Sequence, residues 1–359
     1  MAHLLQRSEF YTAYTPYQPE ISQGTLQYIF EYQSMISELT GMEATNASMY
    51  DGATATAEAM FMMVASAKKR NRVVLSGTLT DAVIRVVETY AHFHGISVTV
   101  VAPKDGVSDQ EAILKEMEAG DVAGVIVPCP NRYGIVEDFT GFADKIHALK
   151  GFLTINADPS ALAVLRTPAE WGADAAVGDG QTLGMPLQFG GPYLGYISCS
   201  KTMLRKMPGR VVGATKDIDG KRGYVLTLQA REQHIRREKA TSNICSNQSL
   251  MALYATIYLA LMGKEGMKEV NRLSCDGAHY LYNKLIATGK FEPAFPGKPF
   301  LKEFTLRTKL DMAKVNEKLL ENGFMGPLVP GDGMAEFAVT EKRTREEIDR
   351  LVEIISKEA

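Results

Sequence analysis

The chain has 359 residues, 45% of them hydrophobic, with a formal net charge of −3 and a pI near 6.1. This length predicts one large domain and a smaller one, and the nearly neutral charge excludes the basic surface typical of nucleic-acid-binding proteins. The four cysteines lack the spacing of a metal site or a disulfide framework. No segment is apolar over the roughly 18 residues of a membrane span, so we expect a cytoplasmic protein without membrane partners.

An N-terminal arm followed by one helix is expected over residues 1–45. Tyr14 and Tyr17 lie in the arm, where prolines at positions 16 and 19 exclude a regular helix. Such a segment suits either internal packing of its tyrosine rings or a pocket wall or subunit interface. Apolar residues at helical spacing predict a helix over 23–39, which Gly41 ends. We expect the large domain over 46–265 and the small one over 266–359.

Strands and helices alternate in the middle of the chain. Short Val/Ile-rich runs predict strands at 73–76, 97–101, 123–127, 152–156, 173–177 and 193–199. Helical patterns lie at 80–93, 109–118 and 138–149. This alternation predicts an α/β fold with a mostly parallel sheet and helices on both faces, which binds ligands beyond the carboxyl ends of its strands.

Three polar side chains, Asn131, Asp158 and Gln181, follow successive strands of this sheet. Enzymes that use pyridoxal phosphate (PLP) place an aspartate for the pyridinium nitrogen at a strand end and the Schiff-base lysine in a later glycine-rich loop. Here 23 residues separate Asp158 from position 181, which holds glutamine in a glycine-rich segment. A carboxamide cannot form the imine, so covalent PLP chemistry at this position is excluded. The pattern indicates a PLP-type scaffold without its lysine, in which Asn131 is the candidate partner of the coenzyme's phenolic oxygen.

An Ala/Met-rich helix is predicted directly after Asp51. The small residues of its first turn are typical of a site where free backbone N–H groups bind a phosphate. Asp51 is a candidate N-cap, and its carboxylate would occupy the place of a dianionic phosphate. We therefore expect helix capping here rather than a phosphate site.

Polar chemistry is most concentrated in residues 231–245, REQHIRREKATSNIC. Four cations among nine residues are typical of a solvated, salt-bridged helix start. Alternatively, the hydroxyls and an arginine bind a phosphate or carboxylate. Beyond this segment we expect two long helices and then a small α+β domain, with elements at 246–262, 267–285, 302–307, 311–322, 335–340 and 343–356.

Three motifs make the chain resemble a known family. They are YTPYQPE at 14–20, NASMYDGAT at 46–54, and the segment 231–245. With them the chain resembles the alpha subunits of split P-proteins of the glycine cleavage system, PLP-dependent glycine decarboxylases. The resemblance covers nearly the whole chain and implies the aspartate-aminotransferase type of fold. Members of this family carry an additional segment before the tyrosine-rich motif, and this chain begins almost at it.

The resemblance implies a division of labour between two subunits. A beta subunit would hold PLP covalently, and glycine would lose CO₂ while its aminomethyl group passes to the lipoyl H-protein. Sites of this fold lie at dimer interfaces, so Thr241, Ser242 and Asn243 are expected to contact the phosphate of the beta subunit's PLP. Asn131 and Asp158 would belong to a degenerate site of this chain. The side chains expected to line the channel for glycine and lipoamide are those of Tyr14, Tyr17 and Arg237.

Two other functions remain open from the sequence. The chain could be an autonomous PLP enzyme of the same fold, which would need another lysine near Asp158. Lys201 lies beyond the next strand and does not meet this condition. A purely structural or regulatory subunit, which never contacts the reacting centre, is the other alternative.

Overall fold

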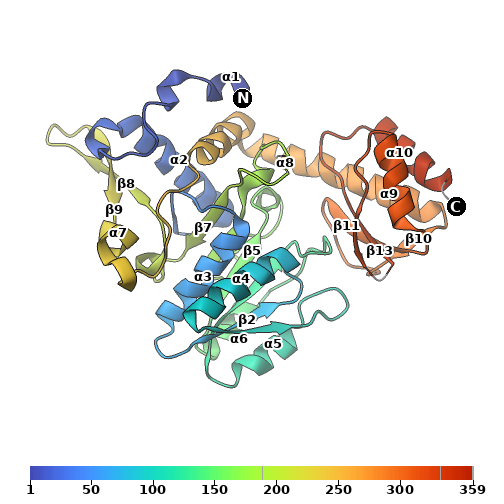
Figure 1. Ribbon diagram of the computed structural model, residues 1–359, viewed down its shortest axis with the longest axis horizontal. Coiled ribbons are helices and arrows are strands. Elements are labelled where there is room, and N and C mark those ends of the chain that lie inside the picture. Colours follow the sequence, from blue (N-terminus) through green and yellow to red (C-terminus); the bar gives the residue numbers. More distant parts are fainter. Residues whose placement is uncertain (188, 332, 358–359) are drawn as a thin grey trace. The chain divides into compact units, whose positions relative to one another are not determined.

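The computed structural model describes residues 1–187, 189–331 and 333–357, and its contacts divide the chain into two compact units (Figure 1). Unit 1 comprises Met1–Ala102, Ser108–Pro128 and Phe139–Gly263. Unit 2 comprises Pro103–Val107, Cys129–Asp138 and Lys264–Ala359. Two loops of the α/β region thus pack with C-terminal residues. The three-part division at residues 45 and 265 stays a prediction from sequence.

A seven-stranded sheet forms the centre of unit 1, in the order β1-β7-β6-β5-β4-β2-β3. The pairs β2–β3, β2–β4 and β5–β6 are parallel, whereas β7 runs antiparallel to both β6 and β1. This confirms the predicted mostly parallel sheet. The strands are β1 Ala44–Thr45, β2 Arg72–Ser76, β3 Ser97–Val101, β4 Val122–Cys129, β5 Phe152–Ala157, β6 Ala175–Asp179 and β7 Gly195–Cys199.

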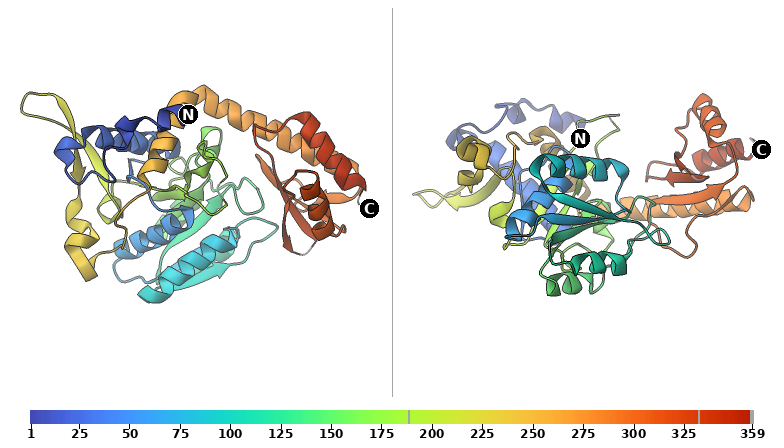
Figure 2. Two further views of the ribbon diagram at one scale, coloured as in Figure 1. Left: turned by 45° about the horizontal axis from the view of Figure 1, so that its top comes forward. Right: turned by 60° about the horizontal axis from the view of Figure 1, so that its bottom comes forward.

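Helices cover both faces of this sheet (Figure 2). Strand order reverses direction after β3, and right-handed crossovers therefore place α5 and α6 on the face opposite to α4. Helix α3 packs beside α4 and against β6 and β7. The remaining helix of the N-terminal region, α2, ends at Gly41, whose φ of 69° is left-handed. The bounds are α1 Ala2–Leu5, α2 Gln23–Thr40, α3 Gly52–Ser66, α4 Asp81–His94, α5 Gln110–Met117 and α6 Phe142–Ala148.

The sequence did not predict a two-stranded hairpin of β8 (Val211–Lys216) and β9 (Arg222–Thr227). The side chain of Gln23, at the start of α2, donates to Tyr224 O at 2.9 Å and accepts from Tyr224 N at 2.8 Å. These bonds attach the hairpin to the N-terminal helix. A short helix, α7 (Gln233–Arg236), follows the hairpin, so the cation-rich segment begins no long helix.

The long helix α8 spans Ser249–Ala287 and is interrupted at Gly263, which has φ 59° and ψ −175°. This interruption agrees with the two separate helices predicted for 246–262 and 267–285. It coincides with the end of unit 1. In the described part of the chain, every helix is too short or too polar to cross a membrane.

Unit 2 contains a four-stranded antiparallel sheet in the order β10-β11-β13-β12, with two helices from the same part of the chain. Its core joins the second half of α8 to the sheet and both helices, through residues such as Leu285, Phe304 and Ile355. The predicted small α+β domain is confirmed in its elements. They are β10 Phe291–Pro293, β11 Glu303–Thr308, α9 Met312–Glu321, β12 Leu328–Gly331, β13 Met334–Ala338 and α10 Arg345–Lys357.

Candidate functional site

The carboxyl ends of β5 and β6 bring Asp158 next to the turn that carries Gln181. These strands pair in parallel, so their ends lie at the same edge of the sheet. The Thr182 hydroxyl donates to Asp158 Oδ1 at 2.5 Å, and the backbone N–H of Ser160 donates to the same oxygen at 3.0 Å. Gln181 itself is half-buried in a short 3-10 turn, Gly180–Thr182. The structure therefore places the expected aspartate and the glutamine in one site.

Two carboxylates bind the first backbone N–H groups of α3. Asp51 accepts from Thr54 N at 2.8 Å, which confirms its predicted role as the N-cap. Asp179, at the end of β6, accepts from Gly52 N at 3.0 Å through Oδ2 and from Gln181 N at 2.9 Å through Oδ1. The N–H groups of Gly52 and Thr54 are the donors that would otherwise bind an anion at the positive end of the helix dipole.

The negative charge of Asp51 and Asp179 at this helix end disfavours the binding of a further anion such as a phosphate. Burial raises the pKa of Asp179, and the neighbouring Asp51 raises it further, because two carboxylates share the space. A Cβ at Gly52 would lie 2.8 Å from Asp179 N, so the helix start and the strand end are in close contact. A PLP phosphate in this chain would have to displace its own carboxylates, and no lysine is present at position 181. The residues here do not fit a PLP held by this chain.

Gly178 makes room for a hydrogen bond beneath the site. The side chain of Tyr196, on β7, lies over Gly178 on β6 and donates to Ala157 O on β5 at 2.8 Å. Tyr196 is fully buried, and burial raises the pKa of its phenol, so it stays a neutral donor. This bond ties β5 to β7 across β6 and fixes the strand ends that carry Asp158 and Gln181.

Asn131 lies in unit 2 and is buried in its own turn. Its Nδ2 donates at 2.8 Å to both Gly106 O and Glu137 Oε1, and its Oδ1 accepts from Tyr133 N and Ile135 N. These bonds use both donors and both lone pairs of the amide. Asn131 shapes the loop after β4, and its predicted contact with a coenzyme oxygen would require some of these bonds to break.

The segment that carries Thr241, Ser242 and Asn243 belongs to unit 1. Thr241 and Asn243 are exposed, whereas Ser242 is half-buried and its hydroxyl donates to Glu58 Oε1, on α3, at 2.8 Å. Arg237 is exposed and has a positive φ of 53°. The three neighbours predicted to contact a phosphate therefore divide into two outward side chains and one inward side chain.

The tyrosines of the N-terminal arm point outward, with Tyr14 76% and Tyr17 74% exposed. Between them, Thr15 is buried and accepts a hydrogen bond from the Arg210 guanidinium. This contact anchors the arm while leaving both rings accessible to a partner or ligand. Internal packing of these two rings, the alternative reading of the arm, does not occur in this chain.

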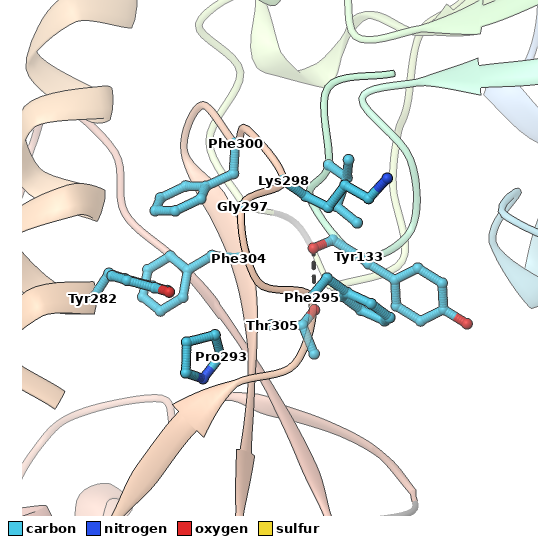
Figure 3. Close-up of a pocket in the computed structure, with 10 residues that line it drawn as sticks. Tyr133, Tyr282, Pro293, Phe295, Gly297, Lys298, Phe300, Phe304 and Thr305 are labelled. Carbon is cyan, nitrogen blue, oxygen red and sulfur yellow. Dashed lines mark hydrogen bonds between the residues drawn. The ribbon is translucent and has the colours of Figure 1, made fainter. Parts of the chain in front are cut away.

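Unit 2 contains a small cavity between its sheet and the loop after β4 (Figure 3). Its volume of about 40 Å³ is lined by aromatic rings that include Tyr133, Tyr282 and Phe304, and Thr305 Oγ1 donates to Tyr133 O at 3.1 Å beside it. This volume suffices for a few water molecules at most. In the described part of the chain, no cluster of three or more His, Cys, Asp or Glu side chains could hold a metal ion.

Sequence reasoning missed Asp179 and Glu58. Asp179 directly precedes the glutamine turn, but its contact with Gly52 spans 127 positions and has no local signal. Glu58 did carry a signal, since it is the sole carboxylate in the otherwise apolar and small-residue helix over 52–66. A lone acid in such a helix points to a specific partner.

Known proteins of one family match this chain over nearly its whole length. The family model of the glycine cleavage system P-protein matches residues 1–355. The probable glycine dehydrogenase (decarboxylating) subunit 1 of Moorella thermoacetica is 53% identical over 358 residues, covering 98% of this chain and 80% of that protein. The protein of the same name from Carboxydothermus hydrogenoformans is 52% identical over 363 residues, with the same coverage of both chains.

Solved structures agree. A crystal structure of glycine decarboxylase (P-protein) of the glycine cleavage system, in inhibitor-bound form, has a TM-score of 0.93 and 41% identity, covering 100% of this chain and 81% of that one. A sphingosine-1-phosphate lyase of Burkholderia pseudomallei, 14% identical with a TM-score of 0.74 over 99% of this chain and 82% of its own, shares the fold. That fold is the PLP-dependent transferase type predicted from the sequence. The chain belongs to the glycine cleavage system P-protein family.

Proposed function

We propose that this chain is the lysine-less subunit of a PLP-dependent glycine decarboxylase and that it completes the active site of a catalytic beta subunit. The reaction converts glycine and lipoyl H-protein into aminomethyl-lipoyl H-protein and CO₂. The observation that carries the proposal is the self-occupied site, in which Gln181 stands at the lysine position while Asp51 and Asp179 bind the helix N–H groups. The relatives named subunit 1 support the existence of a partner subunit.

In this proposal the residues of this chain bind and orient the partner's coenzyme and the substrates. Thr241 and Asn243 offer a hydroxyl and an amide to the phosphate of the partner's coenzyme, which supplies the electron sink for decarboxylation. Tyr14, Tyr17 and Arg237 are exposed, as groups that contact glycine or the lipoyl arm must be. The H-protein is the proposed second partner, and the cytoplasm the proposed location.

The visible absorbance of lysine-bound PLP tests this function. We expect no such band, and no borohydride-trapped PLP, from this chain with added PLP, because position 181 has no amine. After mixing with the beta subunit we expect full PLP occupancy and glycine decarboxylation. A trapped band from this chain alone would instead support the autonomous enzyme.

Thr241→Ala in the reconstituted complex separates the shared site from a purely structural subunit. Loss of a hydrogen bond to a phosphate should weaken PLP binding about tenfold or more, because bonds to charged groups contribute roughly 1.5–3 kcal/mol. The dissociation constant of PLP measures this directly. Unchanged PLP affinity and turnover would favour the structural role.

A further inference from the structure

Glu58 is a buried carboxyl that the proposed function has not yet used. It lies on α3 with 2% of its surface exposed, and Ser242 Oγ donates to its Oε1 at 2.8 Å. Within the described residues its Oε2 has no hydrogen-bond partner. A buried acid costs free energy unless it is paired, so its presence in an apolar helix calls for a specific role.

The segment 241–245 alternates between inward and outward side chains. Ser242 bonds to Glu58, and Ile244 is 7% exposed and packs into the same core as α3. Asn243 lies between these anchors, Thr241 directly precedes the first of them, and both side chains are exposed. Successive side chains of an extended segment point to opposite sides, so fixing the inward pair also fixes the outward pair.

One further bond holds the end of the segment close to the start of α3, since Tyr50 OH accepts from Cys245 N at 3.5 Å. Within the segment, the hydroxyl of Ser242 also accepts from Ile244 N at 3.1 Å. The contact with Glu58 joins the first half of this segment to the body of unit 1 through a side chain. Its loss would leave Thr241 and Ser242 attached through later residues.

We infer that Glu58 is a positioning residue, which anchors Ser242 and thereby sets where Thr241 and Asn243 are presented to the phosphate of the partner's coenzyme. The inference rests on the proposed function and assigns different tasks to neighbouring residues. Ser242 is the internal anchor, and Thr241 and Asn243 make the contacts. Ser242 hydrogen-bonds to the Glu58 carboxyl, and Tyr90 on α4 interacts with it electrostatically; neither side chain is charged near neutral pH.

Hydrogen–deuterium exchange of the full chain tests the anchor without any coenzyme. In Glu58→Ala, the amides of Ile244 and Cys245 should exchange about tenfold faster, because one hydrogen bond of roughly 1–1.5 kcal/mol is lost. Glu58→Gln keeps an oxygen acceptor for Ser242 and should exchange like the wild type. Ser242→Ala removes the same bond from the other partner and should accelerate exchange at Cys245 as Glu58→Ala does, even if truncation of Glu58 impairs folding. The Ile244 amide is not read in this variant, because Ser242 Oγ is its own acceptor.

Val87→Ala is the matched control for general destabilisation. Val87 is fully buried on α4 in the same core, so its truncation lowers stability without touching the segment. Exchange at Ile244 and Cys245 should stay at the wild-type rate in this variant under native conditions. Equal acceleration in Val87→Ala and Glu58→Ala, or none at Cys245 in Ser242→Ala, would overturn the anchor.

The reconstituted complex tests the consequence for coenzyme binding. We expect the PLP dissociation constant to rise about tenfold in Glu58→Ala and Ser242→Ala, with no further rise in the double variant, and to return to normal in Glu58→Gln. Thr241→Ala distinguishes a failure of the positioning role from a failure of the proposed function. Weaker PLP binding in Thr241→Ala alone would overturn the positioning role but keep the shared site, whereas normal binding in all variants would overturn the proposed function as well.

Discussion

As the pH rises from 4.5 to 8.5, the Glu58→Gln variant should become more stable relative to the wild type by about 3 kcal/mol. Burial raises the pKa of Glu58 from 4.5 to about 7. The folded wild-type chain thus holds a proton that the unfolded chain releases between these values, and its stability falls as the pH rises through this window. Glutamine does not ionise, so the variant escapes this loss.

Urea unfolding of both chains at several pH values across this range measures the effect. The difference should be small near pH 4.5, where Glu58 is neutral in the folded state, and should reach its full size above pH 7. Glu88→Gln, which changes an exposed carboxyl on α4, is the control for the loss of one acidic side chain. A constant difference between Glu58→Gln and wild type would mean that Glu58 ionises like a solvated acid.

Gly178→Ala should destabilise the chain by about 3–4 kcal/mol. The new Cβ would overlap with Ala157 O and lie 2.8 Å from Cε1 of the Tyr196 ring. The buried tyrosine would have to move, and its hydrogen bond to Ala157 O would be lost. Both neighbours are buried parts of the sheet, so neither can give way at low cost.

Gly24→Ala provides the control for the change of residue type. Gly24 is exposed in helix α2, and a Cβ there would have no neighbour within 4 Å. Alanine should therefore raise the free energy of unfolding by roughly 0.5–1 kcal/mol through helix propensity. Thermal or urea unfolding compares the two variants, and similar midpoints for them would contradict the account of Gly178.

Local sequence patterns were sufficient to predict most of the helices and strands. Continuous Val/Ile runs predicted β2 to β5, and the glycine after α2 marked its end. The hairpin β8–β9 was missed because its strands are largely exposed and carry charged residues, so they lack the alternation of a half-buried strand. The helix predicted for 138–149 is shorter, Phe142–Ala148, since it begins only after Gly141, whose φ is 72°.

The site was only partly visible in the sequence. Its strand-end residues, Asp158 and Gln181, follow from the order of elements, because parallel strands bring their carboxyl ends together. The pairing of Asp179 with Gly52 and of Glu58 with Ser242 depends on how distant segments pack, over 127 and 184 positions. No local rule of propensity or spacing contains that information. The roles of Tyr14, Tyr17 and Arg237 stay predictions.

The two carboxylates at the start of α3 also mean that this chain does not depend on a bound coenzyme to stabilise this part of its fold. A ligand that binds only the folded state stabilises it in proportion to the logarithm of its concentration. Here Asp51 and Asp179 supply the negative charge that a bound phosphate would supply, and they do so permanently. The folded state therefore needs no bound phosphate at this helix end, and under the proposed function this chain can fold before its partner has bound PLP.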